Sequence, residues 1–165
     1  MTTAIFPNQY NTGPSKVYVM IAEMIKLAAK IGLGVHPDDR ARKGVSLKGK
    51  GNVSVAMQSK RVSRDLAEGV EHMAQVYAYV KYGKLYKSTT QKWCESGTSE
   101  WFPCTTKQAQ AMIMNAFKMA KKLDYDVLAL TTYALDYMEK NNKREPKDWT
   151  RWIEYVRFAQ TRTKR

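Results

Sequence analysis

The chain has 165 residues, of which 44% are hydrophobic and 11% aromatic, and this composition is too apolar for an intrinsically disordered protein. Its 28 lysines and arginines against 15 acidic residues give a net charge of +13, which folding does not require and which attracts phosphate backbones or anionic lipids. No apolar run approaches the roughly 18 to 20 residues of a membrane span, the first residues do not resemble a signal peptide, and two cysteines argue against a disulfide-framed secreted domain. We therefore expect a cytoplasmic protein without a membrane span.

The first predicted helix follows an irregular N-terminal segment. Residues 1–14 are rich in Pro, Gly and Asn, so we expect an extended arm there, with a frayed terminus as the alternative. Ser15 is a suitable N-cap, and apolar residues then recur at helical spacing until Gly32 and Gly34 interrupt them. This pattern predicts a helix over residues 16–31.

Four more helices are predicted further along the chain. A stripe of apolar residues indicates a long helix over about residues 55–82. Thr105 followed by Gln108 has the spacing of a capping box and predicts the start of a third helix. Asp124 is the expected N-cap of a fourth helix, and Pro146 suits the first turn of a fifth.

The fold class follows from these elements. The alternation typical of strands is absent except over residues 44–55, where a short hairpin is conceivable, and no internal repeat is present. We therefore predict an all-α fold in which residues 15–165 form a single-domain bundle of about five helices with a flexible basic loop.

The densest basic segment contains no acidic residue between its first and last arginine. Glycines and serines within it leave the backbone free to follow a phosphate chain and add hydroxyl donors. The alternative is a solvated loop that contacts no ligand. The residues predicted to bind nucleic acid here are Arg40, Arg42, Lys43, Lys48, Lys50, Lys60, Arg61 and Arg64.

A second basic cluster lies at the end of the long helix and beyond it, where lysines alternate with aromatic residues. Single-stranded nucleic acids bind surfaces that combine positive charge with aromatic rings on which bases stack. Tyrosines in a helical protein are nevertheless more often part of the core. The residues predicted to bind nucleic acid here are Lys81, Lys84, Lys87, Tyr82 and Tyr86.

Three large aromatic residues, Trp93, Trp101 and Phe102, are predicted to lie in a loop between helices. If exposed, they would suit a surface that binds a partner subunit; the alternative is that they fold back onto the bundle. Many of the acidic residues lie in the last third of the chain, so we expect one face of mixed charge and one basic face.

Catalytic and metal-binding patterns are weak in this sequence. Neither His36 nor His72 lies beside an obvious catalytic companion, and Cys94 and Cys104 lack the paired spacing of structural zinc sites. No glycine cluster has the pattern of a phosphate-binding loop. We therefore expect a protein that is not an enzyme and needs no cofactor or metal.

The last predicted helix resembles the closing helix of the α-helical small subunits of CRISPR effector complexes. The residues that carry the resemblance are Trp149, Trp152, Ile153, Val156, Arg157, Phe158 and Ala159, which make up less than a tenth of the chain. Size, helical content and positive charge are similar too. The resemblance implies a subunit without enzymatic activity that forms a filament and holds a guide–target duplex or a displaced strand, and no binding residue is carried over from it.

Three hypotheses for function follow. The first is a non-catalytic subunit of a nucleoprotein assembly that binds RNA or single-stranded DNA with little sequence selectivity, such as a subunit of a CRISPR antiviral defence complex. Its partners would include other protein subunits, and self-association is a further expectation. The second is a viral or phage nucleoprotein or architectural protein. The third is an adaptor for acidic proteins or anionic membranes.

Overall fold

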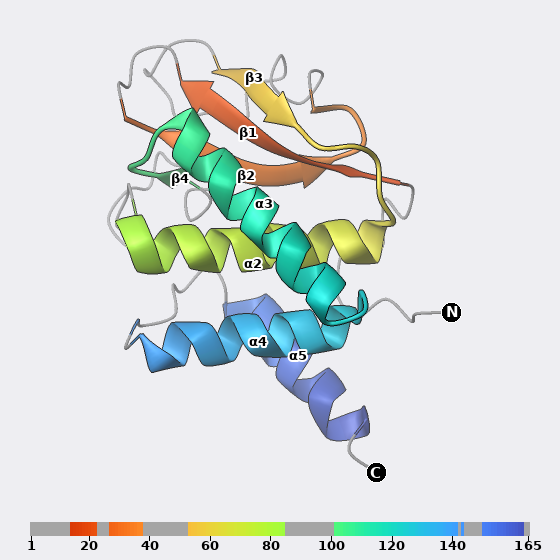
Figure 1. The fold of residues 1–165 in the computed structure, drawn as a ribbon. Coiled ribbons are helices and arrows are strands. Elements are labelled where there is room, and N and C mark those ends of the chain that lie inside the picture. Colours follow the sequence, from red (N-terminus) through yellow and green to blue (C-terminus); the bar gives the residue numbers. More distant parts are fainter. Residues whose placement is uncertain are drawn as a thin grey trace.

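Four strands form one antiparallel sheet in the computed structural model, which describes residues 14–22, 27–37, 53–84, 101–141, 143 and 150–163. The strands are β1 (Lys16–Ala22), β2 (Ala29–Gly34), β3 (Val53–Gln58) and β4 (Trp101–Phe102), in the spatial order β3-β1-β2-β4 (Figure 1). The prediction of an all-α bundle is therefore wrong, and the fold is a mixed α/β fold.

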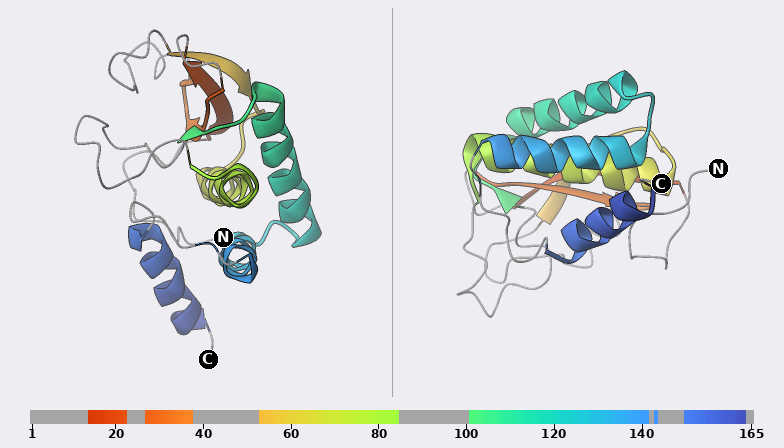
Figure 2. Two further views of the ribbon diagram at one scale, coloured as in Figure 1. Left: turned by 90° about the vertical axis from the view of Figure 1, so that its left-hand side faces the viewer. Right: turned by 90° about the horizontal axis from the view of Figure 1, so that it is seen from below.

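Helices cover one face of this sheet in successive layers. Helices α2 (Arg64–Tyr82) and α3 (Thr106–Lys122) pack against each other and against the sheet. Helix α4 (Val127–Lys140) packs on α2 on the side away from the sheet, and α5 (Thr150–Thr163) contacts α4 (Figures 1 and 2). None of the helices described is long and apolar enough to cross a membrane.

Residues 16–31, which were predicted to be a helix, contain β1 and the beginning of β2 instead. The prediction is wrong because β1 is buried on both faces. Val17 and Val19 face the helices, whereas Tyr18 and Met20 lie in a second cluster on the opposite face of the sheet. A strand buried on both faces is a continuous apolar run, and such a run satisfies helical spacing as well as strand spacing. Periodicity alone could not distinguish a helix from a strand here.

The pairing of β1 with β2 depends on a glycine. Tyr18 lies opposite Gly32 in the register of the two strands, and its ring occupies the space above the glycine. A Cβ atom at Gly32 would lie 2.6 Å from the Tyr18 hydroxyl oxygen, closer than real Cβ contacts come. The ring fills the gap left by the missing side chain and is itself only 1% exposed.

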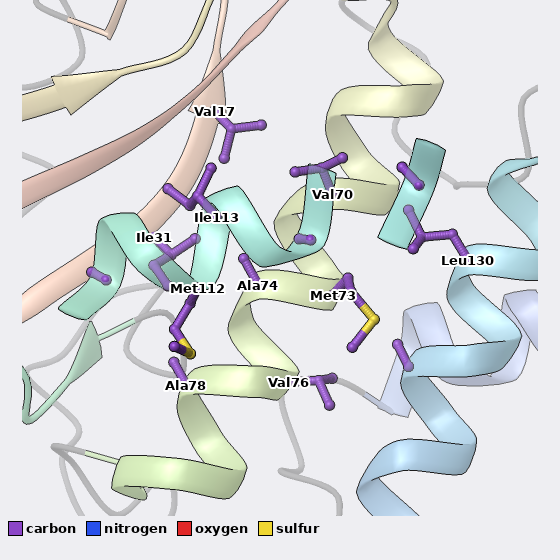
Figure 3. Packing of buried hydrophobic residues seen from close by; sticks show 14 of the residues in the cluster. Val17, Ile31, Val70, Met73, Ala74, Val76, Ala78, Met112, Ile113 and Leu130 are labelled. Atoms are coloured by element: carbon purple, nitrogen blue, oxygen red, sulfur yellow. The ribbon is translucent and has the colours of Figure 1, made fainter. Parts of the chain in front are cut away.

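Apolar residues of the sheet and of α2, α3 and α4 form the main core (Figure 3). Ile31 of β2, Ala74 of α2 and Ile113 of α3 are all buried in it. The side-chain amide of Gln75 in α2 donates a hydrogen bond of 2.9 Å to the carbonyl of Ile31, which ties the helix to the strand. Of the methionines in this core, Met73 is fully buried, as expected for a core residue.

Helices α2 and α4 run in the same direction and approach closely (Figure 1). Gly69 of α2 allows this approach, because a Cβ atom there would lie 3.1 Å from a methyl group of Val127. Further along, the rings of Tyr77 and Tyr137 meet edge to face with centroids 5.0 Å apart. The two helices consequently end at the same side of the molecule.

Helices are also present near the other predicted positions, with changes of boundary; Pro146, the predicted first turn of the fifth helix, lies outside the described residues. The capping box of Thr105 and Gln108 opens α3 as predicted, with hydrogen bonds of 2.9 and 3.1 Å between the two residues. Helix α4 is capped by Asp126 and not by the predicted Asp124, which adopts a left-handed conformation in the preceding turn. The helix predicted over residues 55–82 begins only at Arg64, because β3 occupies residues 53–58.

Candidate nucleic-acid interface

The ends of α2 and α4 bring together residues that are distant in the sequence. Gly83 ends α2 with a φ angle of 79°, and its N–H donates to the Tyr79 carbonyl at 2.9 Å. After α4 ends, the Lys143 N–H donates to the Met138 carbonyl at 3.1 Å, which holds Lys143 against the last turn. Lys143 therefore lies near the end of α2.

Lysines and tyrosines are interleaved at this end of the molecule. The ammonium nitrogens of Lys84 and Lys143 lie 6.0 and 5.7 Å from the centroid of the Tyr79 ring, so they are less than 12 Å apart. The Lys81 ammonium lies 5.7 Å from the centroid of the Tyr82 ring. These residues are all exposed or partly exposed. We call the following residues the helix-end cluster: Tyr79, Lys81, Tyr82, Lys84, Lys140 and Lys143.

The charge of the helix-end cluster exceeds what the two helices need. Lysines near a helix C-terminus complement a partial charge of about −0.5 per helix, which makes about −1 for α2 and α4 together. The cluster carries four lysines, and Glu139 in the last turn of α4 offsets one of them. Counted over the described residues of the two helix ends alone, this leaves about two positive charges more than the helix dipoles require. Such a surplus, spread around aromatic rings, suits a phosphate chain with unpaired bases.

Of the residues predicted from the sequence to bind nucleic acid, Lys81, Tyr82 and Lys84 are in the helix-end cluster. Lys60 and Arg61 are exposed but lie before the start of α2, about 27 Å away along a helix of 19 residues. The fold therefore separates the two groups.

Arg64, the last of the nominated arginines, is committed to an ion pair within its own helix. Its Nε atom donates to Glu68 at 2.8 Å, and only 14% of the Arg64 side chain is exposed. It belongs to a mostly buried polar group on α2 and is poorly placed to contact a phosphate. The remaining nominated residues lie outside the residues that the structure describes: Arg40, Arg42, Lys43, Lys48, Lys50, Lys87 and Tyr86.

Helix α3 carries a second basic surface, which was not nominated from the sequence. One exposed stripe of the helix, the α3 face, consists of Lys107, Ala111, Met114, Lys118 and Lys121. Lys122 is exposed beside it. The signal in the sequence was the absence of any acidic residue between Glu100 and Asp124.

The aromatic residues nominated for a partner surface have a different role here. Trp101 and Phe102 form β4 and are 2% and 0% exposed. Trp101 pairs with Lys30 and Phe102 with Ala29 of β2. Their burial favours the alternative in which they fold back onto this chain. Trp93 lies outside the described residues.

The buried polar group on α2 contains Glu68, Glu71, His72 and Gln75. Burial lowers the pKa of His72 to about 3, so the imidazole is neutral at physiological pH even though Glu71 lies 3.9 Å away. Burial raises the pKa of Glu68, and the ion pair with Arg64 opposes that shift. In the part of the chain that is described, no three potential ligands among His, Cys, Asp and Glu converge as a metal site requires.

Cys104 is a free thiol, buried directly after β4. Burial raises its pKa to about 11, so the reactive thiolate is scarce near neutral pH. This thiol is not suited to nucleophilic chemistry.

No family model, curated protein or solved structure matches this chain. The resemblance to the α-helical CRISPR small subunits is not tested by these comparisons, and the four-stranded sheet differs from what an all-helical subunit would have. The helix that carried the resemblance is present as α5, with Ile153 and Val156 buried.

Proposed function

We propose that this chain is a non-catalytic, nucleic-acid-binding subunit of a nucleoprotein assembly and that it holds single-stranded segments at the helix-end cluster. The observation that carries the proposal is the pair of ammonium groups, Lys84 and Lys143, beside one partly exposed tyrosine ring. A phosphate that lies between them is attracted by both ammonium groups.

The tyrosines favour a single strand over a duplex. A base that stacks on Tyr82 takes the place of the Lys81 ammonium over the ring, and that ammonium is then free to meet the adjoining phosphate. In a duplex the bases are paired and stacked on each other, so the rings would contribute nothing. Stacking on tyrosine accepts every base, and phosphate contacts carry no sequence information, so binding has little sequence selectivity.

The charge of the whole chain adds a long-range electrostatic attraction for nucleic acid. A net charge of +13 accelerates encounter with a polyanion and makes affinity strongly dependent on salt. The CRISPR small subunit and a viral nucleoprotein are both specific instances of such an assembly, and neither is favoured by a contact described above.

The test is fluorescence anisotropy with short labelled single strands and duplexes of RNA and DNA, at salt concentrations from about 50 to 200 mM. We expect tighter binding to single strands than to duplexes, independent of base sequence and weakened by salt. Vesicles with anionic lipid and polyglutamate serve as competitors. Absence of binding at low salt, or displacement of the strand by either competitor at equal charge, would overturn the proposal.

A further inference from the structure

Helices α4 and α5 border a groove of about 700 Å³ on the side of the molecule away from the sheet. Its lining includes apolar residues of α4, among them Leu128 and Leu135. Helix α5 contributes Arg157 and Gln160, and the Gln160 amide donates a hydrogen bond to the Thr132 hydroxyl of α4. Buried Ile153 and Val156 anchor α5, so the groove has two defined walls.

Exposed carboxylates of this basic chain gather around the groove. The described part of the chain has five exposed acidic residues, and three of them, Asp126, Asp136 and Glu139, line the groove. Asp126 is explained by its role as the N-cap of α4. Glu139 is not explained in this way, because it lies in the last turn, where the helix dipole disfavours a negative charge. The acidic rim therefore points to a basic, partly apolar occupant.

The α3 face has the matching chemistry. Its lysines flank Met114, whose side chain is 50% exposed, and no acidic residue occurs anywhere in α3. An exposed methionine adapts its shape to an apolar groove, and lysines on either side of it suit a rim of carboxylates. Helix α3 lies on one side of α2 and α4 and helix α5 on the other (Figure 2, left), so the two helices lie apart within one molecule.

The spacing of the charges agrees as well. From Asp126, the carboxylates of Asp136 and Glu139 follow after 10 and 13 residues, about 15 and 20 Å along the helix axis. From Lys107, Lys118 and Lys121 follow after 11 and 14 residues, about 17 and 21 Å. Two parallel helices thus have their three charges at heights that agree to within about 2 Å along the axis, and Met114 at a height between those of Leu128 and Leu135, while around the axis the carboxylates spread over the rim of the groove instead of forming one stripe.

We propose that the groove between α4 and α5 takes the α3 face of a second copy of this chain. The two surfaces are different, so the contact is head-to-tail, and repeated contacts give a ring or a filament. Because the groove is acidic, it repels phosphate, and this contact needs no nucleic acid. The helix-end cluster belongs to neither surface, so each copy in the assembly keeps its candidate nucleic-acid site.

Sedimentation velocity of nuclease-treated protein at low salt, over a concentration series, tests the proposal with matched variants. Asp136→Lys in the groove and Met114→Glu on the α3 face should each raise the dissociation constant of self-association at least about tenfold. The control Glu154→Lys makes the same charge change outside the groove lining. The control Leu27→Glu replaces an apolar side chain of similar exposure, 47%, outside both surfaces. Both controls should assemble like the unmodified chain.

Mixing the two interface variants separates a head-to-tail contact from a symmetric one. The Asp136→Lys chain keeps its α3 face and the Met114→Glu chain keeps its groove, so an equimolar mixture should form a heterodimer that does not grow further. An unmodified chain that stays monomeric, variants that assemble normally, or a mixture that stays monomeric would each overturn the proposal. Nucleic-acid binding is measured separately, so a negative result for self-association does not contradict the proposal for the helix-end cluster.

Discussion

Replacing Lys84 and Lys143 by glutamine should reduce the salt dependence of nucleic-acid binding by a predictable amount. Each phosphate contact on a single strand contributes about −0.7 to the slope of log K against log salt. Four contacts from the lysines of the helix-end cluster contribute about −2.8, so affinity falls about 50-fold between about 50 and 200 mM salt. With two contacts left, the contribution is about −1.4 and affinity falls about sevenfold.

The difference between the two slopes is the quantity to measure, because contacts elsewhere on the chain add equally to both. Anisotropy titrations of one labelled single strand at several salt concentrations give both slopes. The matched control is the double change of Lys16 and Lys122 to glutamine, which removes the same charge from positions outside the helix-end cluster and outside the α3 face. The control should keep the original slope. Equal slopes for the variant and the unmodified chain, or an equal decrease in the control, would refute the assignment of phosphate contacts to the helix-end cluster.

Three further predictions concern single residues. Tyr82→Leu should weaken single-strand binding by about 1 to 3 kcal/mol without changing the salt slope, whereas Tyr82→Phe keeps the ring and should bind normally in the same titration. Gly32→Ala should lower the free energy of unfolding in urea by about 1 to 3 kcal/mol, because its Cβ displaces the buried Tyr18 ring; unchanged stability would contradict the packing described. The pKa of His72 falls from 6.5 to about 3 on folding, so its contribution to stability is complete above pH 6.5 and is lost as the pH falls towards 3. Lowering the pH from about 7.5 to 5 should therefore cost up to about 2 kcal/mol more in the unmodified chain than in His72→Gln, and equal losses in urea titrations would argue against a buried neutral imidazole.

Local chemistry in the sequence predicted the helical half of the fold. The capping box of Thr105 and Gln108 consists of hydrogen bonds between residues three apart, so it can be recognised from the sequence without knowledge of the fold. The sheet was missed because Tyr18 and Met20 are buried as deeply as Val17 and Val19. The second face of a strand is buried by tertiary contacts, and a run of apolar residues in the sequence does not reveal those contacts.

The candidate site was predictable only in part, for the same reason. The lysines and tyrosines that follow one another near the end of α2 could be read from the sequence. Lys143 lies beside the Tyr79 ring only because α2 and α4 run parallel and approach closely at Gly69. Arg64 was nominated for its charge, although Glu68 lies four residues further along the same predicted helix and is a possible ion-pair partner; that the pair is mostly buried depends on tertiary packing.

Photo-crosslinking directly tests whether the helix-end cluster holds a single strand. The chain would be irradiated in complex with a single-stranded RNA that contains 4-thiouridine, and the adducts would be located by mass spectrometry. We predict adducts on Tyr79 or Tyr82, and their loss when excess unlabelled single strand is added. Specific adducts confined to segments other than the end of α2 and the residues after α4 would contradict the claim that the helix-end cluster holds the strand.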